Sequence, residues 1–138
     1  RDLKYIFLKL VMDIFSFVMV GSNDYKKLSE FYDAIFVPLG IKKIVTTDRY
    51  IGYGNLKESN EIKFYITKPV NGEPATFGNG TQVTFLAKTK KAVDEFYKIA
   101  LSKGAIDEGS PGARSDGNYY AYVRDFDGNK IAAQYITN

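Results

Sequence analysis

The 138-residue sequence contains no cysteine and no histidine. The first absence excludes disulfides, thiolate metal ligands and cysteine nucleophiles, and it is typical of a protein in the reducing cytoplasm. The second absence removes the commonest metal ligand and the commonest general base near neutral pH. Any chemistry in this protein must therefore use Asp, Glu, Lys, Tyr or Arg side chains.

The sequence also lacks an uncharged apolar run long enough to cross a membrane. Residues 5–20 are largely apolar, but Lys9 and Asp13 interrupt them, and a membrane span needs about 20 apolar residues. The formal net charge of +3 comes from 19 basic and 16 acidic residues, which is too small an excess to indicate nucleic-acid binding. We therefore expect neither a membrane nor a nucleic acid as a partner.

The two halves of the chain repeat one another. Glu30-Phe31-Tyr32 recurs as Glu95-Phe96-Tyr97, at an offset of 65 residues, and later matches follow in the same order at an offset of 69. The change of offset requires a few additional residues, which we place in a loop at residues 110–117. Persistent matches of this kind predict two copies of one folding unit. The other matches are Val18 with Val83, Tyr50 with Tyr119, Tyr53 with Tyr122, Asn60 with Asn129 and Ile62 with Ile131.

Each half is predicted to contain a strand, a helix and further strands. Ser22-Asn23-Asp24 and Thr89 supply the capping side chains that begin helices, and apolar residues recur at helical spacing after each of them. A core strand is expected at residues 14–20, and a hairpin turn rather than a paired-carboxylate site at residues 125–129. The other expected strands are residues 42–47, 50–54, 61–67, 82–87, 118–124 and 130–136. The predicted division is an N-terminal appendage (1–11), a first module (12–69), a linker (70–80) and a second module (81–138).

Alternation along these strands separates two faces. One face is consistently apolar and should pack under the helices. The other is mixed, as expected for a half-hydrated concave surface that encloses a ligand cleft. The first-strand and fourth-strand residues predicted on this cleft-facing side are Phe17, Met19, Lys63, Tyr65, Gln82, Thr84, Ala132 and Gln134.

Three segments resemble a known family. They are SEFYDAIFVPLG at residues 29–40, GNGTQVTF at residues 78–85 and VRDFDGNKI at residues 123–131. In this order they resemble the glyoxalase-like branch of the vicinal oxygen chelate superfamily, which includes glyoxalase I and the bleomycin-resistance proteins. The resemblance covers about residues 14–136. It implies an α+β fold of tandem βαβββ modules, with a curved mixed sheet that forms an incomplete barrel and helices on its outside.

The resemblance also implies a metal site that this sequence does not reproduce. The family binds a divalent ion through residues on the first and last strands of each module, and the corresponding positions here are Phe17, Lys63, Gln82 and Ala132. Only Gln82 offers a suitable donor atom, whereas a divalent ion needs several. We therefore expect no metal and no other cofactor, and we do not expect metal-dependent glyoxalase chemistry.

The function that we favour is binding of a small molecule, as in the metal-free resistance proteins. Tyr120 and Tyr122 join Phe17 and Tyr65 as aromatic residues of the predicted cleft, and aromatic walls suit planar ligands. The basic side chains of Lys63 and Arg114 favour a neutral or anionic ligand.

Two alternatives use the same residues. One is a metal-independent isomerase or lyase acting beside a carbonyl, with Lys63 as base, Tyr120 or Tyr122 as acid and Arg114 as anion clamp. The other is a dimeric structural module whose cleft is plugged by Phe17 and other side chains. The resemblance implies a homodimer in each case.

Overall fold

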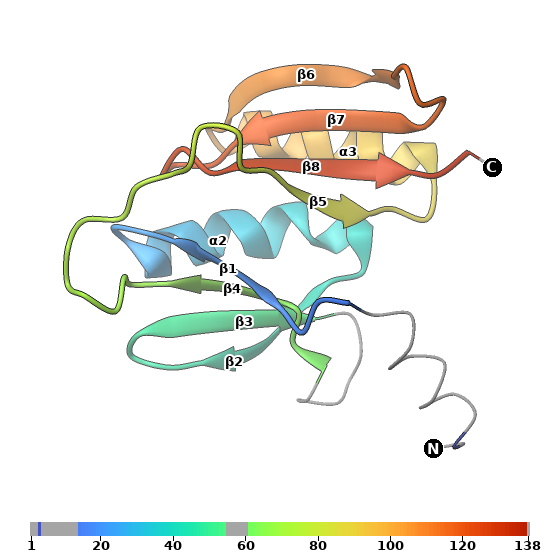
Figure 1. The fold of residues 1–138 in the computed structure, drawn as a ribbon. Coiled ribbons are helices and arrows are strands. Elements are labelled where there is room, and N and C mark those ends of the chain that lie inside the picture. The colour runs from blue at the N-terminus through green and yellow to red at the C-terminus, as the bar shows by residue number, and fades with distance from the viewer. Residues whose placement is uncertain (1–2, 4–13, 55–60, 138) are drawn as a thin grey trace.

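The structure is a computed structural model that describes residues 3, 14–54 and 61–137. Within them the chain forms two successive modules with the same order of strands and helix (Figure 1). The first module consists of β1 (Val18–Gly21), α2 (Tyr25–Ile35), the 3-10 helix η1 (Val37–Leu39), β2 (Lys42–Thr46), β3 (Tyr50–Gly54) and β4 (Phe64–Thr67). The second consists of β5 (Val83–Leu86), α3 (Lys90–Ser102), β6 (Ile106–Ala113), β7 (Tyr119–Arg124) and β8 (Lys130–Tyr135).

Each module builds its own mixed four-stranded sheet. The strand orders are β1-β4-β3-β2 and β5-β8-β7-β6, and the first strand of each module pairs in parallel with the last strand while the other pairs are antiparallel. The predicted α+β fold of tandem βαβββ modules is confirmed. The strands pair as two separate sheets that do not close into a barrel. Figure 1 shows both sheets in front and the helices behind them.

Two sequence predictions about strands were wrong. The strand expected at residues 14–20 begins only at Val18, and Ile14 and Phe15 are exposed because they have no partner strand among the described residues. In the second module, half of the loop predicted at residues 110–117 belongs to β6. This strand has poor intrinsic propensity, since it contains two glycines and Pro111, but it lies at the sheet edge where proline is tolerated.

The additional residues of the second module lie partly in β6 itself. Its pairing with β7 shifts register between Asp107 and Gly109 and again between Gly109 and Gly112. Irregularities of this kind add residues to one strand without changing its partner. The offset between the two halves therefore changes inside a strand as well as in the turn that follows it.

Both helices begin at capping side chains that the sequence predicts. The carboxylate of Asp24 accepts a hydrogen bond from Lys27 N, and the hydroxyl of Thr89 accepts one from Ala92 N. Each bond satisfies a backbone N–H that the first turn leaves without a partner. The helices then bury one apolar face each, and none of the helices in the described ranges is long and apolar enough to cross a membrane.

The core joins the two modules through aromatic rings. Phe85 of β5 packs edge to face against Phe36 and Phe64 of the first module, with ring centroids 4.9 and 5.1 Å apart. Tyr32 and Tyr53 complete this cluster. A first-strand residue of the second module therefore contributes to the core of the first.

The turn at residues 125–129 fastens the modules together. Asp127 accepts hydrogen bonds from Ser22 Oγ at 2.7 Å and from Asn23 N at 2.9 Å, and both donors directly precede α2. The buried carboxylate of Asp125 accepts one from Tyr32 OH at 2.7 Å. Asn129 Nδ2 donates to the carbonyl of Gly21 at 3.1 Å. We call residues 125–129 the junction turn.

Candidate functional site

The sheet face opposite α3 carries a stacked pair of tyrosines. Residues on β7 alternate, and Tyr119 points toward α3, where its hydroxyl donates to Asp94 at 2.7 Å. Tyr120 and Tyr122 therefore lie on the other face, where their rings stack with centroids 5.5 Å apart and planes 9° from parallel. In this geometry each ring turns one face toward the other ring.

Two cations lie over this tyrosine pair. The guanidinium of Arg114 is 5.3 Å from the ring centroid of Tyr122, and the ammonium of Lys130 is also 5.3 Å from it. Arg114 is held in place because its Nη2 donates to the carbonyl of Ser110 at 2.7 Å. Cations at this distance from an aromatic ring are attracted by its electron-rich face. The result is a preorganised surface that is positively charged.

A glycine makes room for this arrangement. Gly109 lies opposite Tyr122 in the β6–β7 pairing and has φ of 154°. A Cβ atom there would come within 2.9 Å of the Tyr122 ring and 3.2 Å of Arg114 Nη2. The position therefore requires glycine on steric grounds, because any larger residue would displace the ring or the cation.

Hydrogen bonds keep the Tyr120 phenol protonated. Tyr120 OH donates to a carboxylate oxygen of Asp116, which raises the pKa of Tyr120, and the same bond lowers the pKa of Asp116. Tyr120 OH also accepts from Gln134 Nε2 at 2.8 Å. A phenol held in this way stays neutral near pH 7.

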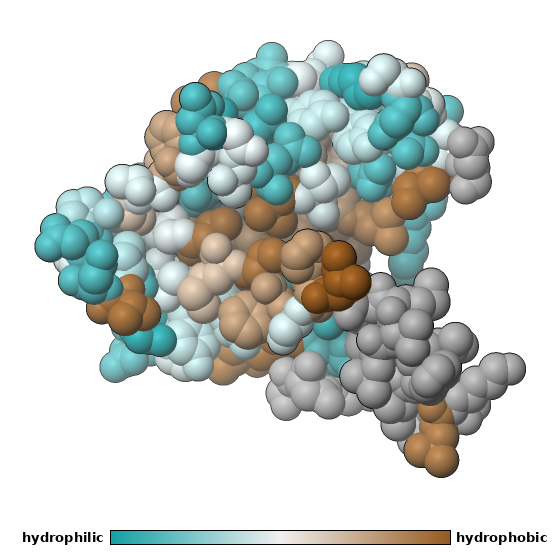
Figure 2. Space-filling model, viewed as in Figure 1, coloured by the Kyte–Doolittle hydropathy of each residue, from teal (hydrophilic) through white to brown (hydrophobic). Residues whose placement is uncertain are grey.

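The corresponding face of the first module is more apolar. Phe17 packs edge to face on Tyr65 with centroids 5.0 Å apart, and Tyr50 packs on the other side of Tyr65 at 5.3 Å. Met19 pairs with Tyr65 in the β1–β4 register. Phe17 and Met19 are 49% and 44% exposed, so neither is enclosed by its own chain. Figure 2 shows apolar side chains gathered on this front face over β1 and β5.

A cavity of 370 Å³, which we call the junction cavity, lies between the modules. Its apolar wall comes from the starts of β1 and β4, the end of β3 and the whole of β5. Lys63, Gln82 and Thr84 of the predicted cleft contribute its polar groups, and Gln82 Nε2 donates to Thr84 Oγ1 at 2.9 Å. The apolar residues that matter below are Val18, Ile41, Phe64, Val83 and Phe85.

The structure thus divides the predicted cleft into three groups. Phe17, Met19 and Tyr65 share the first sheet, Arg114, Tyr120, Tyr122 and Gln134 share the second, and Lys63, Gln82 and Thr84 line the junction cavity. Ala132 pairs with Tyr122 and is fully buried, so it is not available to a ligand.

Sequence reasoning missed Tyr50 and Lys130, which complete the two aromatic groups. Tyr50 matches Tyr119 in the repeat, yet the two side chains have different neighbours: Tyr50 packs on Tyr65, whereas Tyr119 bonds to Asp94. Lys130 begins β8 and reaches the Tyr122 ring across the β7–β8 pairing. Strand alternation around Tyr65 could have identified the first, but no local signal indicated the second.

The four positions at which the family would hold a metal do not fit a divalent ion. Phe17 and Ala132 carry no donor atoms, Lys63 carries a positive charge, and the Gln82 amide is engaged with Thr84. In the part of the chain that the structure describes, no group of three or more Asp, Glu, His or Cys side chains could hold an ion instead.

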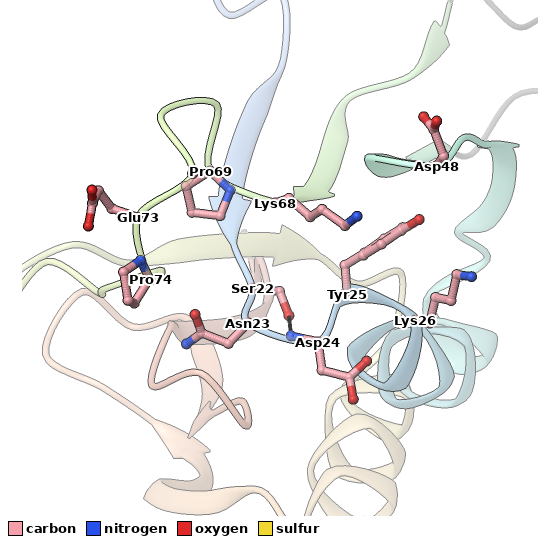
Figure 3. A pocket seen from close by; sticks show the side chains of 11 residues that line it. Ser22, Asn23, Asp24, Tyr25, Lys26, Asp48, Lys68, Pro69, Glu73 and Pro74 are labelled. Atoms are coloured by element: carbon pink, nitrogen blue, oxygen red, sulfur yellow. Dashed lines mark hydrogen bonds between the residues drawn. The ribbon is translucent and has the colours of Figure 1, made fainter.

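A wider hollow of 670 Å³ lies at the start of α2, beneath residues 68–74. Figure 3 shows the side chains of Tyr25 and Lys68 side by side at its centre, and the ammonium of Lys68 is 5.5 Å from the Tyr25 ring centroid. Asp48 and Glu73 lie at opposite sides of it (Figure 3). Ser22 and Asn23 line the hollow but already bond to the junction turn. None of the residues predicted for the cleft lines it.

The fold and the position of these surfaces define a glyoxalase-like protein, and comparison with solved structures agrees. A glyoxalase/bleomycin resistance protein from Albidiferax ferrireducens T118 is 40% identical, with a TM-score of 0.80 over 90% of this chain and 99% of that chain. A glyoxalase/bleomycin resistance protein/dioxygenase family enzyme from Burkholderia phytofirmans PsJN is 19% identical, with a TM-score of 0.67 over 88% of this chain and 97% of that one. The lactoylglutathione lyase from Agrobacterium tumefaciens is also 19% identical, with a TM-score of 0.62 over 90% and 93% of the two chains.

The chain belongs to the glyoxalase/bleomycin resistance protein family, within the vicinal oxygen chelate superfamily. The two relatives at 19% identity share the fold alone. No protein-family model and no curated protein sequence matches the chain.

Proposed function

We propose that this protein binds a small planar molecule, neutral or anionic, without a metal ion. The observation that carries the proposal is the stacked pair of Tyr120 and Tyr122 with Arg114 and Lys130 over its ring surface. Stacked rings offer contact area to a flat ligand, and the two cations favour negative charge on it. The ligand would lie on the sheet face opposite the helices.

Metal independence is part of the proposal. It rests on the donor atoms of Phe17, Lys63, Gln82 and Ala132, which together supply one amide where an ion needs several ligands. A cytoplasmic location is also part of it and rests on the absence of cysteine.

The geometry favours binding over the isomerase or lyase alternative. That mechanism needs Lys63 close to Tyr120 or Tyr122, since a base and an acid must reach the same substrate atoms. Lys63 lines the junction cavity beside β1, whereas both tyrosines are on β7 of the other sheet. The raised pKa of Tyr120 also makes its hydroxyl a weaker acid.

We further propose that the protein forms a homodimer through the face that carries Phe17 and Met19. These side chains are about half exposed on a surface that is apolar around β1 and β5 (Figure 2). An apolar surface of this kind on a soluble domain is characteristic of an interface. In such a dimer the partner chain would cover Phe17, the side chain that the structural-module alternative places in the cleft. Sedimentation of the wild type and of Met19→Lys tests it, and a monomeric wild type would contradict it.

Calorimetric titration with planar compounds tests the binding proposal. We expect 2-naphthoate or coumarin to bind, and a cationic planar dye to bind more weakly because of Arg114 and Lys130. Tyr122→Ala should weaken binding about tenfold, which corresponds to about 1.4 kcal/mol of lost ring contact. Tyr119→Phe is the matched control, because Tyr119 lies on the opposite face of the same strand.

Two results would contradict the proposal. One is the absence of any binding heat across neutral and anionic planar compounds. The other is unchanged affinity after Tyr122→Ala.

A further inference from the structure

The two ends of the module junction are built from equivalent elements. At one end, the starts of β1 and β4 meet the strand β5 and enclose the junction cavity. At the other end, the starts of β5 and β8 meet Val20 of β1. The sheets have the same strand order, so each end combines the first and last strands of one module with the first strand of the other.

The ring of Phe77, which is 51% exposed, lies over one of these ends. Phe77, from the linker before β5, lines this end, and only 20 Å³ of space remains there. The ring lies against Gly128, where a Cβ atom would come within 2.4 Å of it, and φ at this glycine is 85°. The guanidinium of Arg124 lies 5.3 Å from the ring centroid. Phe77 therefore shows which chemical group this geometry accommodates.

Among the described residues, Phe15 lies at the edge of the equivalent end and is 67% exposed, and more space remains there. The junction cavity has a volume of 370 Å³ and is walled by Val18, Phe64, Phe85 and their neighbours. An apolar cavity of about 150 Å³ accommodates benzene, and ligand pockets begin at about 300 Å³. This space is therefore sufficient for one substituted ring.

We propose that the junction cavity binds a single aromatic ring that carries an amide or carboxylate substituent. The ring would occupy the apolar wall as Phe77 does at the other end. The substituent would face the rim, where the Gln82 side chain and Thr84 provide hydrogen-bonding groups next to Lys63. This inference rests on the proposed function and adds the class of ligand, because Thr84 at the cavity belongs to β5, an edge strand of the sheet that also contains Tyr120 and Tyr122.

Fluorine NMR with 4-fluorobenzamide and 4-fluorobenzoate tests the inference on the full chain. We expect saturable binding of at least one probe by the wild type. Val18→Phe should fill the cavity and weaken binding at least tenfold. Val37→Phe introduces the same side chain at an exposed position of η1 and should leave affinity within twofold. Thermal unfolding of both variants establishes that they fold.

A second experiment looks for a new binding site in a variant. Phe77→Ala should empty the other end of the junction, and crystals of this variant grown with 4-fluorobenzamide should show a second ring beside Gly128. This arm does not depend on whether Val18→Phe folds.

The inference and the proposed function can fail separately. Two outcomes would overturn the inference and leave the proposed function standing. The first is equal probe binding by Val18→Phe and the wild type. The second is no binding of either fluorinated probe while Tyr122→Ala still weakens binding of 2-naphthoate. A crystal structure with the cavity occupied by a side chain of the protein itself would also overturn it. If no planar compound bound to the protein, both the inference and the proposed function would be contradicted.

Discussion

The two modules share one backbone plan but fill it with different side chains. Phe64 in β4 corresponds by strand register to Ile131 in β8, because they pair with the equivalent residues Val18 and Val83, and both side chains are buried. The first module surrounds Phe64 with the rings of Tyr32, Phe36 and Tyr53, whereas the second buries Ala100, Ala121, Val123 and Ile131. The strand order remains the same because backbone pairing is independent of how the core volume is divided.

The exposed faces differ as well. By strand register, Tyr65 in the first module corresponds to Ala132 in the second, and Lys63 corresponds to Lys130. The first face is apolar and the second combines aromatic rings with cations. Under the two proposals above, one copy of the folding unit would serve association and the other would serve ligand contact.

Truncating Phe64 should give the largest change in this comparison. Phe64→Ala removes a buried ring that packs on four other rings, and we expect it to lower the free energy of unfolding by about 4 kcal/mol. Ile131→Ala, the same truncation at the equivalent position of the second module, removes a smaller buried side chain and should cost about 3 kcal/mol. Urea denaturation measures both, and similar losses would contradict the view that the first module holds the larger share of aromatic packing.

Removing Asp127 should give the next largest effect. Asp127→Ala breaks the hydrogen bonds from Ser22 Oγ and Asn23 N across the module boundary, and we expect a loss of about 2 kcal/mol. Asp116→Ala is the control, because this turn carboxylate bonds only within the second module. If both variants were equally stable in urea, the junction turn would not fasten the modules.

The smallest effect concerns pH. Burial raises the pKa of Asp125 in the folded protein, so the folded state retains a proton that the unfolded state has lost. Stability is therefore fully present below the ordinary carboxyl pKa of about 4 and declines as pH rises through the raised value. We expect this decline in the wild type and its absence in Asp125→Asn, as measured by chemical denaturation at a series of pH values.

Tyr32→Phe sharpens the pH experiment. The hydrogen bond from Tyr32 lowers the pKa of Asp125, so its removal should move the decline toward higher pH. A decline at the same pH in this variant would show that Asp125 is not the titrating group.

Much of the fold followed from local pattern. The Glu-Phe-Tyr repeat and the three family-like segments predicted tandem βαβββ modules, and Asp24 and Thr89 marked the helix starts. β6 was harder to place because Gly109, Pro111 and Gly112 have low strand propensity and are held by pairing with β7. Pairing partners distant in sequence leave no local signal.

The candidate site was less predictable. Alternation predicted that Tyr120 and Tyr122 share one face, but it gave no sign that Lys130 reaches the Tyr122 ring. It also grouped Lys63 with Tyr120 in one cleft, whereas the structure assigns them to different surfaces. The equivalence of the two junction ends depends on strand order, and the sequence alone did not reveal it.

The sequence by itself determined the two modules, the helix caps and the chemistry available, because these depend on residue types and on spacing within one segment. Only the tertiary structure decided that Phe77 lies over one end of the junction while more space remains at the other, and that Asp127 accepts a hydrogen bond from Ser22 just before α2. These features arise where residues more than 50 positions apart meet. Such contacts depend on how complete elements pack, which no local pattern specifies.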